Sequence, residues 1–202
     1  MIHYTVHPVN PQRHILEKVV AMLRREDAIC VYPTDTVYGM GSPVNNAKAI
    51  DRVSRLMEKD KTRLFSFVCS DFPQISTYAR LSNNQFKIMK HYLPGPFTFL
   101  LPATALVPKK VCPKRKVVGI RYPDCVVCLE LVRLLGEPLA NTSIRLDGGL
   151  RGDPDEVRPA VLNEVDVMLD IGMLENPMNS TIVDLTEETP VLIRQGKGIF
   201  NG

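Results

Sequence analysis

Several common features are missing from this chain of 202 residues, and each absence excludes a class of protein. No apolar run reaches about 18 residues, the length that a transmembrane helix needs, so we expect no membrane partner. The N-terminal sequence MIHYTVHPVN lacks the charged-then-apolar order of a signal peptide, which favours a cytoplasmic protein. The hydrophobic content of 45% is enough for one good-sized core, so one α/β domain over residues 1–202 is expected.

Disulfide and metal chemistry are also poorly represented. Five cysteines are an odd number in a long chain, which argues against a disulfide framework. Cys125 and Cys128 form a CxxC pair, but no second pair or nearby histidine completes a zinc site. Cys128, Leu131 and Leu135 share an apolar stripe at helical spacing. This pattern favours a cysteine buried in the core over a metal-binding or redox pair. A zinc or redox protein stays open as a third alternative, although the four histidines are scattered and we expect no metal site.

The usual nucleotide and hydrolase motifs are absent as well. The stretch VYPTDTVYGMGS, residues 31–42, leaves a buried strand at Pro33 and enters a polar loop that ends in two glycines. This loop has neither the lysine nor the spacing of a P-loop, and no GxGxxG follows any predicted strand. No Ser/His/Asp or Cys/His pairing predicts a hydrolytic triad. Any catalysis would therefore rest on positioning and charge stabilisation.

Hydroxyl side chains recur where predicted strands begin or end. Each one alone is more often a satisfied turn or strand residue. Arg121 in VGIRYP and Arg194 in VLIRQG end other strands, and arginine offers a planar fork for carboxylate or phosphate. Together these residues predict a polar cavity for an anionic ligand. The hydroxyl residues of this set are Thr34, Thr36, Tyr38, Thr98, Thr142, Ser143 and Ser180.

The net charge of +3 hides a strong asymmetry. Residues 153–188 contain ten acidic residues and one basic residue, which leaves the rest of the chain at about +12. The densest basic segment, VPKKVCPKRK, contains no acid and favours a polyanion such as RNA. Each base alone is more often part of a solvated loop, and the RNA-binding prediction rests on the set. Its members are Lys109, Lys110, Lys114, Arg115 and Lys116.

Strands and helices alternate along the chain without a repeat, which predicts a twisted mixed sheet with flanking helices. Helical spacing in residues 12–25 places Ile15, Val19, Met22 and Leu23 on one face. Further helices are expected after Asn45 or Asn46, as two short helices after residue 70 of which the later begins at Ser82, over residues 125–135 up to Gly136, and from Asp153. Strands are expected in residues 28–33, 64–70, 97–103, 116–123, 138–146, 165–171, 180–186 and 190–196.

Five motifs occur in an order that resembles the YrdC/YciO family over about residues 12–198. They are PTDTVYGMG, PGPFTFLL, VGIRYP, PLANTS and STIVDLT followed by VLIRQG. The resemblance implies a YrdC-like fold with a concave basic surface. It also implies the chemistry of threonylcarbamoyl-AMP synthases, which use L-threonine, bicarbonate and ATP in tRNA modification, and the family's binding of double-stranded RNA and nucleotides. By this resemblance Thr34 contacts threonine, Tyr38 packs nearby, and Arg121 lies in the same cavity.

Two departures from the synthase motifs place the chain closest to the YciO branch. The synthase signature KxRP corresponds to MEKD, with Met57 in place of the lysine and Lys59 in place of the arginine. The family's TSAN reads TSIR, so Arg145 stands where asparagine would bind nucleotide. Lys59 and Arg145 therefore join the candidate ligand-binding residues.

The leading hypothesis is a YciO-type protein that binds double-stranded RNA or tRNA, or a nucleotide, near tRNA modification or translation. The alternative is an enzyme that still makes threonylcarbamoyl-AMP and releases pyrophosphate. The resemblance implies ATP with Mg as a substrate complex, a nucleotide or threonine-like small ligand, and no tightly bound cofactor. We expect the Arg121 side chain to leave the sheet and face the cavity beside the loop.

Overall fold

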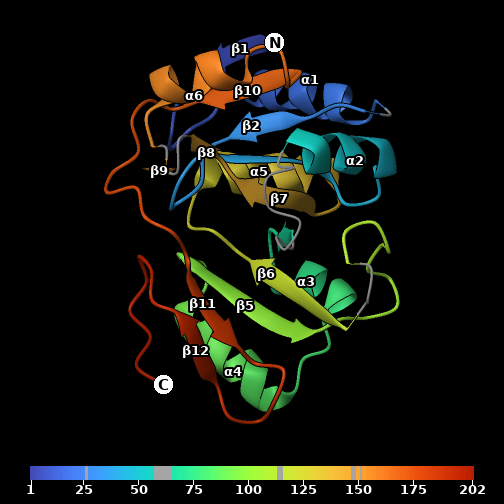
Figure 1. Ribbon diagram of the computed structural model, residues 1–202, viewed down its shortest axis with the longest axis vertical. Helices are drawn as coiled ribbons and strands as arrows, with labels where there is room; N and C mark the ends of the chain where they lie inside the picture. Colours follow the sequence, from blue (N-terminus) through green and yellow to red (C-terminus); the bar gives the residue numbers. More distant parts are fainter. Residues whose placement is uncertain (26, 57–64, 113–115, 147–148, 151) are drawn as a thin grey trace.

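The computed structural model describes residues 1–25, 27–56, 65–112, 116–146, 149–150 and 152–202. A mixed ten-stranded sheet dominates the fold, in the order β1-β10-β2-β3-β7-β4-β6-β5-β11-β12, and a separate pair is formed by β8 and β9 (Figure 1). The strands are β1 (Ile2–Thr5), β2 (Cys30–Tyr32), β3 (Gly39–Pro43), β4 (Ser66–Val68), β5 (Phe97–Pro102), β6 (Val117–Arg121), β7 (Leu139–Ser143), β8 (Arg145–Leu146), β9 (Gly149–Leu150), β10 (Val167–Asp170), β11 (Thr181–Asp184) and β12 (Val191–Arg194). The helices are α1 (Arg13–Leu23), α2 (Ala47–Leu56), α3 (Phe72–Tyr78), α4 (Asn83–Tyr92), α5 (Val126–Leu135) and α6 (Pro154–Val161).

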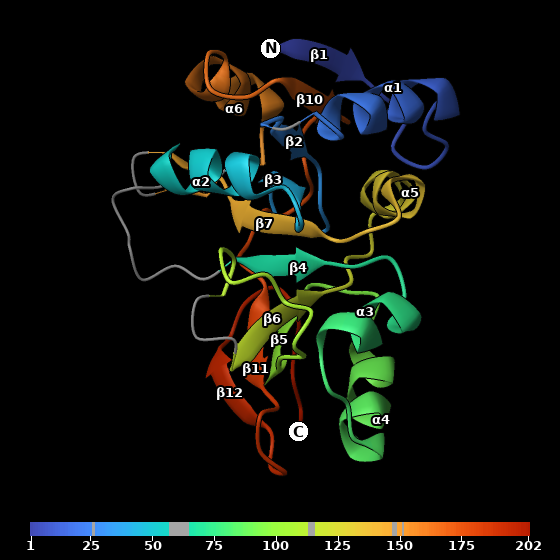
Figure 2. The ribbon, with the colours of Figure 1, turned by 90° about the vertical axis from the view of Figure 1, so that its right-hand side faces the viewer.

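The predicted fold class, a mixed α/β sheet with flanking helices, is confirmed. β1, β10 and β2 run parallel, β2-β3-β7-β4 alternate in direction, and both parallel and antiparallel pairs follow towards β12. Figure 2 shows α1, α5, α3 and α4 on one side of the sheet, with α2 and α6 on the other. Three apolar clusters fill the spaces between these helices and the strands.

The helices leave one part of the sheet uncovered. Phe97, Phe99 and Ile120 point towards α3 and α4 and belong to the same apolar cluster. Because side chains alternate along a strand, Thr98 and Arg121 point to the opposite face. In the described part of the chain no helix covers that face of β5, β6, β11 and β12, as Figure 1 shows from the front.

Local hydrogen bonds set the helix ends as the sequence predicts. Ser82 and Gln85 form a capping box at the start of α4, and Asp153 caps α6. Asn46 accepts the backbone N–H of Ala49 and so caps α2. Gly136 ends α5 with φ of 82°, a left-handed conformation that glycine adopts without steric cost.

Two expectations about local structure were only partly right. The fully buried residues of α1 are Leu16, Val19, Val20 and Leu23; of the predicted face, Val19 and Leu23 are among them, whereas Ile15 and Met22 are only partly buried at the margin of the same cluster. Residues 39–41 belong to β3 and not to the loop before it. A Cβ atom on Gly41 would collide with the carbonyl oxygen of Ala140, so glycine is needed here for β3 to pair closely with β7.

Candidate functional site

The polar loop between β2 and β3, residues 34–38, is held by its own hydroxyl groups; we call it the threonine loop. Thr34 Oγ1 donates to the carbonyl oxygen of Val37 at 2.6 Å and accepts the backbone N–H groups of Thr36 and Val37. Thr36 Oγ1 lies 2.9 Å from Thr34 Oγ1, and both residues are buried. These hydroxyls fix the shape of the loop, as hydroxyls commonly do in turns.

Asp35 joins the threonine loop to the end of β6. Arg121 Nη2 donates to Asp35 Oδ1 at 2.5 Å, and the two side chains are only 3% and 8% exposed. The backbone N–H of Asp124 donates to the other carboxylate oxygen. Sequence reasoning correctly placed Arg121 beside this loop, but its guanidinium is occupied by Asp35 and does not form an open fork. Arg121 Nε is buried and has no hydrogen-bond partner among the described residues.

Tyr38 turns away from this ion pair. Its hydroxyl donates to the carbonyl oxygen of Gly172 at 2.8 Å and accepts the backbone N–H of Ile171 at 3.1 Å. Burial raises the pKa of this phenol, which therefore stays neutral. The Tyr38 hydroxyl anchors the loop to the end of β10, and a direct contact with ligand stays a prediction.

A second group of polar residues lies on β5, β11 and β12. Thr98 Oγ1 and Ser180 Oγ are 2.8 Å apart, and Arg194 donates through Nη2 to the Ser180 carbonyl oxygen at 2.8 Å. Thr181 Oγ1 accepts the backbone N–H of Gly196 at 2.9 Å. The structure thus brings together three of the predicted residues that are far apart in sequence.

The strand register places Arg121 and the Thr98–Ser180–Arg194 group at the same end of neighbouring strands, and Asp35 joins the threonine loop to Arg121. Val68 is the partner of Arg121, and Ile182 is the partner of Thr98. The antiparallel register that pairs Phe99 with Ile120 continues to put Thr98 beside Arg121. Hydroxyls and guanidinium groups therefore meet on the face of the sheet that no described helix covers.

The remaining predicted residues are less closely connected. Thr142 and Ser143 are half-buried on β7 opposite Met40 and Gly39. Arg145 lies in β8, where the structure does not describe the side chains. Met57 and Lys59 lie outside the described residues.

The predicted RNA-binding segment is only partly described. Lys109 and Lys116 are exposed, whereas Lys114 and Arg115 lie outside the described residues. Lys110 forms an ion pair with Asp51 of α2 at 2.7 Å, which offsets part of the basic charge. An RNA interface at this segment stays a prediction.

The cysteines lie where the core interpretation expects them. Cys128 is buried in the apolar cluster between α1, α5 and the sheet, and Cys125 is half-buried at the start of α5. Within the described ranges, no three His, Cys, Asp or Glu residues are arranged to hold a metal ion. None of the described helices combines the length and apolar character required to span a bilayer.

A separate cavity of about 370 Å³ lies at the start of α2 and contains none of the predicted ligand-binding residues.

Two charged residues that were not predicted do join the candidate site. Asp35 is the acid of the threonine loop, and its position between Thr34 and Thr36 could have indicated a role. Lys197 Nζ contacts the backbone of the same loop, which no local sequence pattern indicates.

Comparison with known proteins connects this geometry to a family. A family model for Sua5/YciO/YrdC, described as telomere recombination, matches residues 22–196. An uncharacterized protein of Haemophilus influenzae is 37% identical over 200 residues, covering 96% of this chain and 95% of the relative. Escherichia coli YciO is 35% identical over 199 residues with the same coverage, and a threonylcarbamoyl-AMP synthase of Vibrio vulnificus is 29% identical over 187 residues, covering 90% and 98%.

Solved structures of YciO and Sua5 proteins match the fold of this chain. The crystal structure of E. coli YciO matches with a TM-score of 0.91 and 33% identity, covering 98% of both chains. Pyrococcus abyssi Sua5 complexed with L-threonine matches with a TM-score of 0.89 and 24% identity, which shows the fold alone. The match covers 97% of this chain and 58% of that longer one. The chain belongs to the Sua5/YciO/YrdC family, as its motifs predicted.

Proposed function

We propose that this chain is a YciO-type protein that binds a nucleotide or a threonine-like ligand and acts in tRNA modification. The observation that carries the proposal is the meeting of the threonine loop and Arg121 with the Thr98–Ser180–Arg194 group. The neighbouring strands β6, β5, β11 and β12 supply Arg121, Thr98, Ser180 and Arg194 at or next to their ends, and Asp35 joins the threonine loop to Arg121. The half-buried Arg194 and the hydroxyls beside it suit an anionic ligand, because groups held on rigid strands need little reorganisation on binding, while Arg121 holds the threonine loop in place through Asp35.

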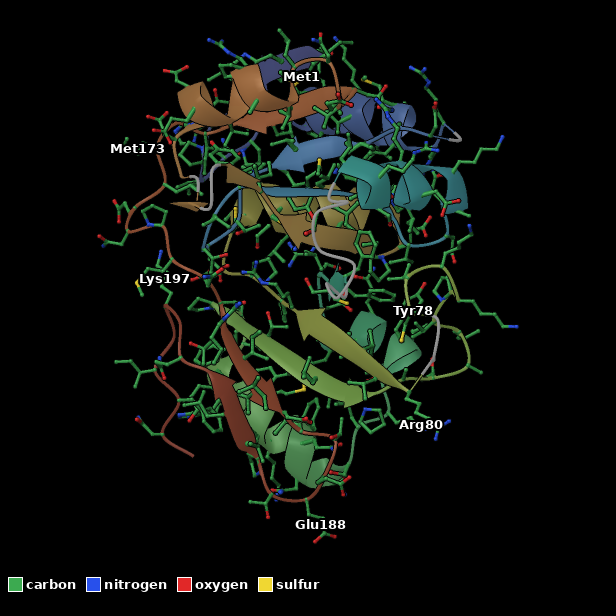
Figure 3. All side chains as sticks on the ribbon, viewed as in Figure 1. Met1, Tyr78, Arg80, Met173, Glu188 and Lys197 are labelled. Carbon is green, nitrogen blue, oxygen red and sulfur yellow. The ribbon has the colours of Figure 1, made fainter. Side chains whose placement is uncertain are left out.

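The test is calorimetric titration with ATP–Mg and with L-threonine. The wild-type chain is expected to bind at least one of them, and Arg194→Met should weaken binding by about tenfold, since charged hydrogen bonds contribute about 1.5–3 kcal/mol. Arg80→Met is the matched control, because Arg80 is exposed and lies on the opposite side of the molecule (Figure 3). Absence of binding to both ligands would reject the proposal.

RNA binding forms the second arm of the same proposal and rests on the exposed Lys109 and Lys116. Filter binding to double-stranded RNA at two salt concentrations measures it. Affinity should fall steeply with salt, because phosphate contacts release counterions. A signal that is absent or insensitive to salt would remove RNA from the proposal.

A second candidate function is threonylcarbamoyl-AMP synthesis. The similarity to the V. vulnificus synthase over 90% of the chain favours it, together with the retained PTDT motif. Incubation with L-threonine, bicarbonate and ATP–Mg should then release pyrophosphate above a control without threonine. Release equal to that control would leave ligand binding as the proposed function.

A further inference from the structure

Lys197 connects three segments that are distant in the sequence. Its Nζ donates to the carbonyl oxygen of Asp35 at 2.9 Å and to the carbonyl oxygen of Glu175 at 2.8 Å. Its backbone N–H donates to the carbonyl oxygen of Asn179. The threonine loop, the connection between β10 and β11, and the C-terminal segment (residues 195–200) therefore meet at this side chain. Figure 3 labels Lys197 at the side of the molecule, level with the boundary between the two halves of the sheet.

The charge of Lys197 is not neutralised by these contacts. Carbonyl oxygens accept hydrogen bonds but carry no net charge, and an ammonium group has three hydrogens, of which two are used here. Within the described residues, no carboxylate forms an ion pair with Lys197, whereas Arg121 pairs with Asp35. A half-buried cation with an unused donor and no counter-ion favours an anion at that position.

The position of this ammonium group matches the candidate site. Asp35 receives Lys197 on its backbone oxygen and Arg121 on its side chain, so both cations lie around one residue. Arg194, which contacts Ser180, is three residues before Lys197 on the same C-terminal stretch. Lys197 therefore lies between the threonine loop and the Thr98–Ser180–Arg194 group.

We propose that Lys197 is a ligand-binding residue whose third N–H donates to an oxyanion of the ligand held at the threonine loop. The proposal rests on the proposed function and names a residue for it. A compact ammonium group can donate a hydrogen bond to a phosphate or to a carboxylate. The oxyanion is thus a nucleotide phosphate or an amino-acid carboxylate, and the two are separated by experiment.

The experiment compares Lys197→Met, which keeps the aliphatic stem, with Lys197→Arg and with Lys90→Met, a change at an exposed lysine of α4. Binding of ATP, adenosine, L-threonine and L-threoninol is measured by calorimetry. If Lys197 contacts a phosphate, Lys197→Met should lose about tenfold or more in ATP affinity but less than about twofold for adenosine. If it contacts a carboxylate, the loss should fall on L-threonine and spare L-threoninol.

A purely structural role for Lys197 would give another pattern. If Lys197 only holds the threonine loop in place, its loss would lower the affinity for charged and uncharged ligands equally. That result would overturn the proposal. Equal affinities of Lys197→Met and the wild-type chain would also overturn it, while leaving the proposed function intact. Lys197→Arg should recover part of the affinity, and Lys90→Met should behave like wild type.

Inorganic pyrophosphate separates failure of the inference from failure of the proposed function. If the wild-type chain binds neither ATP nor L-threonine but binds pyrophosphate in a Lys197-dependent manner, the anion site stands and the proposed function fails. If pyrophosphate binding is absent or independent of Lys197 in that case, both fail.

Discussion

At the scale of single residues, this chain contains a buried ion pair and an exposed one. The side chains of Arg121 and Asp35 are 3% and 8% exposed, whereas those of Lys110 and Asp51 are 56% and 48% exposed. Arg121→Ala would leave a buried carboxylate without its cation, so we expect a loss of about 3–5 kcal/mol in unfolding free energy. Lys110→Ala should cost about 0–1 kcal/mol. Urea unfolding measures both, and equal losses would contradict the assignment of Arg121 as a structural partner of Asp35.

The reactivity of Cys125 provides a second prediction for a single residue. Burial raises the pKa of this thiol to about 11, so only about one molecule in a thousand carries the thiolate at pH 8. Alkylation of Cys125 by iodoacetamide at pH 8 should be on the order of a hundredfold slower than that of a free cysteine, and it should accelerate towards pH 11. Mass spectrometry after timed quenching gives the rate. Alkylation at the speed of a free thiol would reopen the redox alternative.

At the scale of elements, the C-terminal segment depends on the absence of a side chain at Gly198. A Cβ atom there would collide with the ring of Phe97, which itself packs against Tyr92 with ring centroids 4.9 Å apart. Gly198→Ala should therefore destabilise the chain by about 1–3 kcal/mol and displace Lys197, which weakens ATP binding as well. Gly119→Ala is the control for stability, since its Cβ would make only ordinary contacts, the nearest at 3.5 Å to Thr98. Thermal melting measures both variants and calorimetry measures Gly198→Ala, and a Gly198→Ala variant that behaves like wild type would show that the segment can shift freely.

The elements that were predicted from sequence are those whose signals are local. Capping at Ser82 and Asp153 and termination at Gly136 depend on hydrogen bonds and dihedral angles within a few residues, so the sequence around them is informative. β1 was not predicted, because a strand of four residues is defined by its partner β10, about 165 positions later.

The same limit applies to the candidate site. The motifs correctly placed Arg121 beside the threonine loop, but the contact that occupies it comes from Asp35, 86 positions away. Lys197 reaches the loop across 162 positions, and no spacing rule reports such a contact. Residue types at the ends of strands were thus predictable, whereas the partners of those residues required the fold.

At the scale of the whole molecule, buried thiols and phenols make stability sensitive to high pH. Burial raises the pKa of Cys30, Cys69, Cys128, Tyr32 and Tyr38 in the folded state. The unfolded chain releases these protons from about pH 9 for thiols and pH 10 for phenols, so its free energy falls relative to the folded chain as pH rises.

The contribution of these protonated groups to the unfolding free energy should be fully present below about pH 8.5. Above that pH it should decline, by up to about 1.4 kcal/mol per pH unit for each group. Urea unfolding at pH 7, 9 and 10 measures the decline, and a Cys69→Ala variant should show a shallower slope. An unfolding free energy that stays constant up to pH 10 would mean that these groups ionise in the folded chain as readily as in the unfolded chain.

The place of β10 in the sheet also decides when the start of the chain can fold during synthesis. Val167 is the partner of both Ile2 and Cys30, so β1 and β2 are never neighbours and each pairs with β10. At about 5–20 residues per second, the ribosome adds β10 roughly 7 to 27 seconds after β2 has been made. For that interval β1 has no strand to pair with, and its backbone groups are open to other chains. β1 is therefore open to mispairing with other chains during translation, until β10, in the last quarter of the chain, has emerged.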